Sequence, residues 1–108
     1  MTNRNLLYGW KNVDADVAIR LLADALQQEF VLGGGDYVGG DIWRTPIGSE
    51  EVIQVQYNFV DEEGLHYEEE FPEYSLLVEI AESRRWDFIE DQLRKIEGLD
   101  LLRLEVFE

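Results

Sequence analysis

The chain is expected to fold as an α+β sandwich of two layers, with two helices on one face of a mainly antiparallel sheet and the second face exposed. Two segments repeat apolar residues at the spacing of one helical face, and several others alternate apolar and polar residues as strands do. The helical segments lie toward the two ends of the chain. The expected order is α-β-β-β-β-β-α-β, and the 108 residues form a single domain, 1–108.

The first helix is predicted at about residues 14–28. Asn12 or Asp14 can cap its start, and the early carboxylates favour the positive end of the helix dipole. The apolar positions of this segment share one helical face, and they are Val13, Val17, Leu21, Leu22, Ala25 and Leu26. Before the helix, NLLYGW reads as an additional edge strand.

The middle of the chain predicts antiparallel strands. EFVLGGGDYVGGDIWRTPIG indicates two short strands and their turn, ended by Pro46. EEVIQVQYNFV then alternates with a period of two, which places Ile53, Val55, Tyr57 and Phe59 toward a core and Gln54, Gln56 and Asn58 toward water. DEEG forms a turn, and LHYEEEF returns as the partner strand, so that residues 51–71 make a hairpin that ends at Pro72.

The last third predicts a strand, a helix and a strand. SLLVEIAE is apolar enough for the interior of a sheet. Ser83 caps a helix of about fourteen residues whose apolar positions recur at helical spacing, with Gly98 at its C-terminal cap. These apolar positions are Trp86, Ile89, Leu93 and Ile96. LLRLEVF is the final strand, and a right-handed crossover sets it parallel to SLLVEIAE.

Charge restricts the partners. Twenty-four acidic residues against nine basic ones give a net charge of −15, which repels nucleic acid phosphates and anionic lipid. Direct nucleic-acid and membrane binding are therefore disfavoured. The chain has no cysteine and no apolar run long enough to cross a bilayer, so we expect a cytoplasmic protein, with a monomer favoured.

No catalytic pattern stands out, and we expect no enzyme, no cofactor and no metal site. His66 lies on a predicted strand without a visible partner and reads as a surface histidine. The acidic run from Asp61 to Glu70 lacks the spacing of a calcium loop, and abundant glutamates do not make a glycosidase pair. GGGDYVGGD matches neither phosphate-binding glycine motif, so its glycines are assigned to a turn and a strand bulge.

The segment VDEEGLHYEEEFPEY, residues 60–74, holds seven carboxylates and no lysine or arginine. From Thr45 to Ser83 there are eleven acidic residues and no lysine or arginine. Such clustering costs stability through repulsion between like charges. Two interpretations remain open: a solvated face that keeps the chain in solution, and a surface that docks against a positively charged cleft on another protein.

The second interpretation assigns twelve residues to partner binding: Tyr37, Trp43, Gln54, Gln56, Asp61, Glu62, Glu63, Tyr67, Glu68, Glu69, Glu70 and Glu73. The carboxylates would pair with arginines of the partner, and aromatic side chains would supply the desolvated contacts. The hairpin that contains Tyr37 and Trp43 is the alternative place for the interface.

The runs GGDYVGGDIWR, EEVIQVQYNFVDEEG and FPEYSLLVEIAES, followed by a short helix and strand, resemble the small acidic immunity proteins of bacterial toxin systems. The resemblance implies an α+β protein that binds a cognate toxin with a basic surface and blocks its active site, without catalytic residues of its own. Alternatives are a nucleic-acid mimic that inhibits a restriction or CRISPR enzyme, a module that binds a small ligand or cation, and a weak acyl or glycosyl enzyme.

Overall fold

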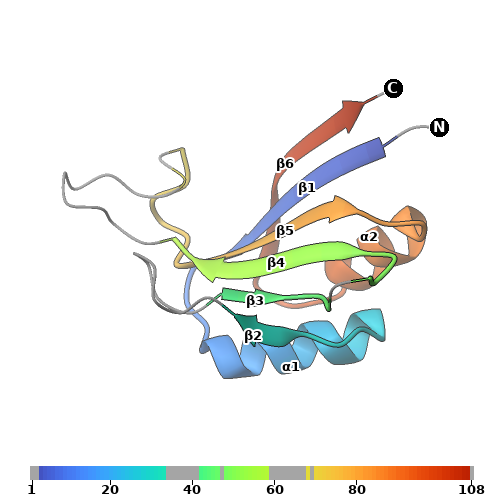
Figure 1. The fold of residues 1–108 in the computed structure, drawn as a ribbon. Helices are drawn as coiled ribbons and strands as arrows, with labels where there is room; N and C mark the ends of the chain where they lie inside the picture. The colour runs from blue at the N-terminus through green and yellow to red at the C-terminus, as the bar shows by residue number, and fades with distance from the viewer. Residues whose placement is uncertain (1–2, 34–41, 47, 59–67, 69, 108) are drawn as a thin grey trace.

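The computed structural model describes residues 3–33, 42–46, 48–58, 68 and 70–107 (Figure 1). The elements in chain order are β1 (Asn3–Trp10), α1 (Ala15–Leu26), β2 (Val31–Gly33), β3 (Ile42–Arg44), β4 (Val52–Tyr57), β5 (Leu76–Glu82), α2 (Trp86–Arg94) and β6 (Leu99–Phe107). The expected α+β class is confirmed, but one strand precedes the first helix, and in the described residues four strands instead of the expected five lie between the two helices. No helix in the described ranges is both long and apolar enough to span a bilayer.

The strands form one antiparallel sheet in the order β2-β3-β4-β5-β1-β6. The prediction of NLLYGW as an edge strand is wrong, because β1 lies between β5 and β6. The physical reason is that β1 is apolar on both faces: Leu6 and Tyr8 are buried on one face and Leu7 on the other. A strand with two buried faces belongs inside a sheet.

The strand–helix–strand unit at the end of the chain is confirmed. Both β5 and β6 pair with β1 in antiparallel fashion, so they run parallel to each other with β1 between them. The interior position predicted for SLLVEIAE is confirmed as well, because β5 pairs on both sides, with β4 and β1.

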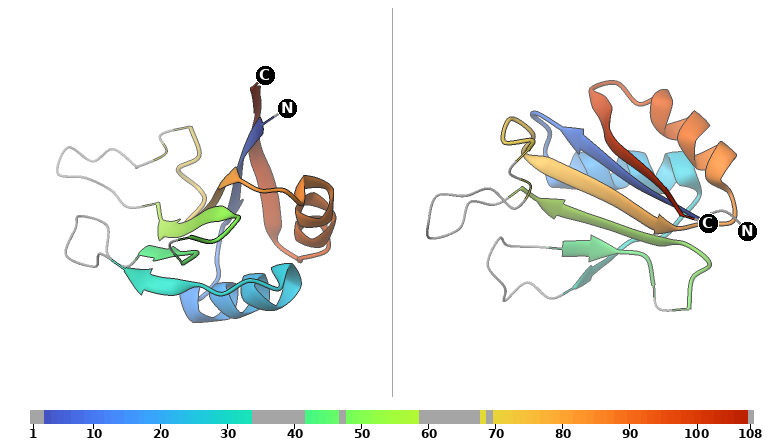
Figure 2. Two further views of the ribbon diagram at one scale, coloured as in Figure 1. Left: turned by 45° about the vertical axis from the view of Figure 1, so that its right-hand side comes forward. Right: turned by 90° about the horizontal axis from the view of Figure 1, so that it is seen from above.

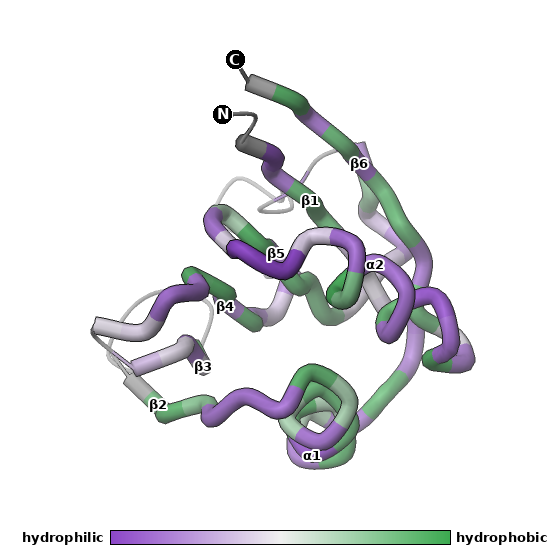
Figure 3. Tube along the Cα trace, turned by 90° about the vertical axis from the view of Figure 1, so that its right-hand side faces the viewer, coloured by the Kyte–Doolittle hydropathy of each residue, from purple (hydrophilic) through white to green (hydrophobic). Residues whose placement is uncertain are grey.

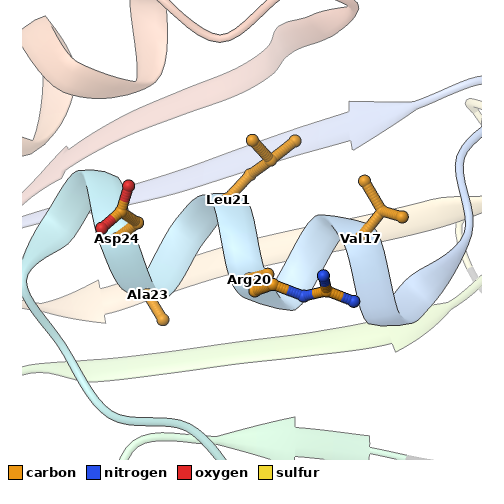
Figure 4. A pocket seen from close by; sticks show the side chains of 5 residues that line it. All are labelled: Val17, Arg20, Leu21, Ala23 and Asp24. Atoms are coloured by element: carbon orange, nitrogen blue, oxygen red, sulfur yellow. The ribbon is translucent and has the colours of Figure 1, made fainter.

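Both helices cover the same face of the sheet, as Figures 1 and 2 show, and one core joins them to it. The helix α1 lies within the predicted bounds, but its buried face is rotated from the predicted one. Val17 and Leu21 are 43% and 44% exposed, and Figure 4 shows them on one side of the helix. The buried positions are Ala15, Ala18, Leu22 and Leu26. The small side chains of Ala15 and Ala18 pack in the main core with Leu22 and Leu26, whereas the larger Val17 and Leu21 extend toward solvent.

The helix α2 is shorter than expected and begins after Arg85, not after Ser83. The Ser83 hydroxyl does accept a hydrogen bond from the Arg85 backbone N–H at 2.8 Å, so it still organises the turn before the helix. Gly98, at φ 83°, sits in the turn that leads into β6 and beyond the end of the helix.

The expected exposure of the second face of the sheet is wrong at its centre. Leu7, Leu77 and Tyr74 form a small buried cluster there, with Phe71 and Leu102 packed against it. Gly9 permits the close approach, because a Cβ at that position would lie 2.8 Å from Leu102 Cδ1 and 2.9 Å from Tyr74 Cδ1. The chain between β4 and β5 therefore covers part of this face.

The predicted hairpin of residues 51–71 is also wrong in its pairing. Residues 54–56 of β4 pair with β3 on one side and with β5 on the other, so these residues have no free side for a strand at 65–71. Residues 59–67 and 69 of the predicted hairpin lie outside the described residues. In the described part of that segment, Glu68 and Glu70 lie in a bend and a turn. Gln56 and Asn58, expected to face water, are 8% and 7% exposed. The Asn58 side chain is hydrogen-bonded to the returning chain at Phe71, and that of Gln56 is hydrogen-bonded to Gln54.

An ionic network centred on a buried carboxylate joins both helices to β4. Glu51, just before β4, is 3% exposed and accepts hydrogen bonds from Arg85 Nε at 3.0 Å and a second Arg85 nitrogen at 2.6 Å. Gln28 Nε2 donates at 2.9 Å and the Ser83 hydroxyl at 2.7 Å. Arg85 also donates to the Leu26 carbonyl at the end of α1, at 2.8 Å. One carboxylate and one guanidinium thus hold three elements together.

Burial raises the pKa of Glu51, but the hydrogen bonds from Arg85, Ser83 and Gln28 and the charge of Arg85 outweigh it, so that the net pKa lies below its usual value. A lowered pKa in the folded state adds stability above the pKa of the unfolded chain, about 4.3. That contribution is lost as the pH falls through the folded-state pKa.

Glu51→Ala should lower the free energy of unfolding by about 3 kcal/mol, because it strands the Arg85 guanidinium and removes four hydrogen bonds. Urea denaturation monitored by tryptophan fluorescence measures this.

The matched control is Glu50→Ala, because Glu50 also pairs with an arginine, Arg84 at 3.5 Å, but both side chains are exposed. This substitution should change the free energy of unfolding by no more than about 0.5 kcal/mol. The wild type should also lose more stability than Glu51→Gln as the pH falls below about 4.3. Equal costs for the Glu50 and Glu51 variants would contradict the role of this network.

Candidate protein-interaction site

The acidic segment, residues 60–74, follows the end of β4. The described chain stops at Asn58, just before this segment, and resumes within it at Glu68. The glycine-rich segment leaves after Gly33 and returns at Ile42. Ile42 pairs with both Gly33 and Gln56, so the two segments connect to the sheet at the same end (Figure 1). The sequence offered these two segments as alternative interfaces, and the register brings their attachment points together.

Asn58 clamps the acidic segment to the sheet. Its side-chain carbonyl accepts a hydrogen bond from the Glu68 backbone N–H at 2.8 Å, and its amide nitrogen donates to the Phe71 carbonyl at 2.8 Å. Its own backbone N–H donates to the Ser75 carbonyl at 2.9 Å. The polar alternation along β4 predicted a solvent-exposed side chain at Asn58. The residue is instead buried, and both the oxygen and the nitrogen of its side-chain amide are hydrogen-bonded to the returning chain.

Arg103, on β6, supplies the cation beneath the segment. Its guanidinium donates to Glu68 at 3.0 Å, lies 3.8 Å from a Glu70 oxygen and sits 5.7 Å from the centre of the Phe71 ring. The hydrogen bond to Glu68 is the main cause that raises the pKa of Arg103. Glu68 has a 19% exposed side chain, whereas that of Glu70 is 76% exposed. Glu68 is therefore an anchor, and Glu70 faces outward.

Tyr74 closes the base of the segment. Its hydroxyl donates to Asp100 Oδ2 at 2.9 Å, and the Lys11 ammonium lies 5.6 Å from its ring centre. The hydrogen bond to the Asp100 carboxylate raises the pKa of Tyr74. The ring also makes an edge contact with Phe71. Both residues belong to the acidic segment and pack its described part against the sheet.

The other residues assigned to partner binding lie in different settings. Glu73 is exposed, as Glu70 is, in the same segment. Gln54 is half-buried and Gln56 buried, and together with Glu79 they border a small hollow over Leu7 and Leu77. Trp43 packs against the main core and makes an edge contact with Tyr57. Six residues lie outside the described residues: Tyr37, Asp61, Glu62, Glu63, Tyr67 and Glu69.

Sequence reasoning missed the three side chains that organise this site. Nothing in the sequence pattern indicated a role for Arg103, because an arginine that alternates with leucines on a strand is typical of a solvent-exposed position. Asp100 and Asn58 likewise looked like ordinary polar residues. Only the register of β6 against β1, which sets Arg103 opposite Leu7 and Asp100 opposite Gly9, brings the two β6 residues under the acidic segment.

Two other surfaces, on α1 and on α2, offer fewer features of a binding site. The depression on the outer side of α1 is open and mainly apolar, and Figure 4 shows its lining: Val17, Arg20, Leu21, Ala23 and Asp24. On α2, Asp87 and Glu90 face Arg4, and Asp91 faces Lys95 at 3.2 Å. Within the described ranges, no group of three or more potential metal-ligating side chains comes together.

Comparison with known protein families, with characterised proteins and with solved structures gave no match. The site must therefore be interpreted from its own chemistry. That chemistry is an acidic segment with two fixed ends, supported by aromatic rings and one guanidinium.

Asn58→Ala should release the returning part of the acidic segment, at Glu68 and Phe71, from the end of β4. It leaves the Glu68 amide and the Phe71 carbonyl without their partner, so stability should fall by about 1–3 kcal/mol. Hydrogen exchange followed by NMR should show the Glu68 amide exchanging faster in the variant. The control is Gln54→Ala, a half-buried position on the same strand, which should leave that amide unchanged. An unaltered Glu68 amide in Asn58→Ala would refute the clamp.

Proposed function

We propose that the protein binds a cationic protein partner through the acidic segment of residues 60–74 and blocks that partner's active site, as an immunity protein blocks its cognate toxin. The partner presents a basic cleft of the kind that holds phosphate-bearing substrates. Carboxylates of the segment take the place of those phosphates. The protein itself carries out no reaction in this role.

The excess of negative charge in the acidic segment is the main support for this proposal. The segment holds seven carboxylates and no lysine or arginine. Three of these carboxylates, Glu68, Glu70 and Glu73, lie in its described part, where a single guanidinium, Arg103, pairs with two of them. One positive charge cannot balance three carboxylates. The free protein therefore stores repulsion in this segment, and a partner that brings arginines or lysines relieves it.

The anchored ends favour binding further. Asn58 fixes the segment where it leaves and where it returns, which reduces the conformational entropy lost on association. Glu70 and Glu73 are exposed on either side of Phe71, which is partly buried. Exposed carboxylates around an aromatic side chain suit arginine, which pairs with carboxylates in bidentate geometry and stacks on rings.

A nucleic-acid mimic is the second candidate, and the acidity of α2 favours it. Asp87, with a fully exposed side chain, extends negative charge to a helix remote from the segment, as mimicry of a phosphate backbone requires. Its partner would be a DNA-processing enzyme, so the identity of the partner distinguishes the two roles.

The test is capture of the partner from the producing cells, its identification, and measurement of association by stopped flow over a range of NaCl concentrations. The partner should be a toxin domain whose activity falls when the complex forms. Glu70→Gln with Glu73→Gln should slow association at low salt by about threefold or more and flatten its salt dependence.

Asp24→Asn with Glu29→Gln is the matched control, because it removes the same charge at the end of α1, remote from the segment. Association that is insensitive to salt, or slowed equally by both pairs of substitutions, would contradict the proposed interface. A DNA-processing enzyme as the partner would favour mimicry instead.

A further inference from the structure

The strand β6 is the outermost strand at one edge of the sheet. It pairs with β1 on one side, and no strand among the described residues pairs with its other side. Three large apolar side chains are half-exposed along it: Leu101, Leu104 and Val106, at 49%, 50% and 55%. Figure 3 shows hydrophobic and hydrophilic residues alternating toward the end of β6. Long apolar edges of this kind readily pair with another strand.

The end of β6 also belongs to the least supported part of the sheet. β5 pairs with β1 only from Leu6 onward, so Asn3–Asn5 pair with Glu105–Phe107 alone. Figures 1 and 2 show this two-stranded ribbon extending away from the helices, with the two termini side by side. A two-stranded ribbon is marginally stable by itself. A further strand along β6 would complete it.

We propose that the partner on this edge is a second copy of the chain, which pairs β6 with β6 in antiparallel fashion about a two-fold axis at Leu104. The sequence of β6 is self-complementary in this register. Leu104 lies opposite Leu104 of the second copy, and Arg103 lies opposite Glu105 in both directions. Side chains directly opposite each other share a face, so Leu104 and Val106 of both copies join in one apolar row.

Charge selects this register over its neighbours. Moving the axis to Arg103 would set two arginines opposite each other, and moving it to Glu105 would set two glutamates opposite each other. A shift by a single residue between two strands would instead pair side chains from opposite faces. The strand β6 is regular after the irregularity near Leu102. Among the two-fold registers centred in this regular part, only the register centred at Leu104 places unlike charges opposite each other and also pairs identical apolar side chains at the axis.

The net charge of −15 opposes the dimer at long range. Because salt screens that repulsion, the dimer should become tighter as NaCl rises to physiological concentration and above. This is opposite to the salt dependence proposed for the acidic segment, and the two interfaces are therefore distinguishable. The dimer does not rest on the proposed function.

Sedimentation equilibrium of the wild-type chain at several concentrations and salt levels tests the proposal. We expect a reversible monomer–dimer equilibrium that shifts toward the dimer with salt. Leu104→Glu places two like charges at the axis and should weaken the dimer by about tenfold or more. Leu32→Glu is the matched control, since Leu32 is a 61% exposed leucine on the opposite edge strand, β2, and it should leave the dimer unchanged.

Glu105→Arg is the sharper variant. It reduces the negative charge of each chain, which favours any non-specific association, yet it sets a second guanidinium opposite Arg103 of the other copy and should weaken the specific dimer. Glu97→Arg, an exposed position before β6, makes the same charge change outside the strand and should not weaken it. Circular dichroism of each variant verifies that it is folded.

The register itself can be trapped because the chain has no cysteine. Leu104→Cys should form a disulfide-linked dimer under mild oxidation, whereas Leu32→Cys should not, because only position 104 meets itself at the axis. A wild-type chain that stays monomeric at all concentrations and salt levels would overturn the proposal. A dimer weakened equally by the Leu32 and Leu104 variants, or strengthened by Glu105→Arg, would overturn it as well.

Discussion

The scarcity of positive charge is the constraint on which this structure depends. Nine basic residues accompany twenty-four acidic ones, and three arginines with partly buried side chains join parts of the chain that are far apart in sequence. Arg85 binds Glu51 and the end of α1, Arg103 binds Glu68, and Arg4 binds Glu90. Each pair sits where a helix or a loop meets the sheet. Most of the other carboxylates in the described ranges are exposed, and their mutual repulsion opposes folding.

The three pairs differ in what they provide. The Glu51–Arg85 pair is buried at its carboxylate and carries additional hydrogen bonds, so its partners are costly to separate. The Arg103–Glu68 pair is part-buried and works with Asn58, so it fixes the position of a segment more than it stabilises the core. This division explains how a segment with so many like charges stays attached to the sheet. Rigid attachment of an acidic surface is what a charged partner requires, because fast and specific docking depends on charges held in register.

Much of the fold could be predicted from pattern. Periodicity located both helices and the β5–α2–β6 unit, because apolar spacing depends on nothing beyond the local chain. The position of NLLYGW was missed, because strand order depends on long-range pairing that alternation does not encode. The buried face of α1 was misjudged, since Ala15 and Ala18 were outweighed by the larger Val17 and Leu21. For the site, composition located the acidic segment, but the anchors Asn58 and Arg103 come from tertiary register, and a single polar residue on a strand carries no such information.

The proposed function requires that the carboxylates of the acidic segment be uncompensated in the free protein. This requirement is tested most directly by the free energy of unfolding of the monomeric chain as a function of NaCl concentration, for the wild type and for Glu70→Gln with Glu73→Gln. The account predicts that salt stabilises the wild type by screening repulsion, and that it stabilises the double variant less. A wild type that salt destabilises, or one that responds no more than the variant, would show that attractive ion pairs already balance these charges and would contradict the account.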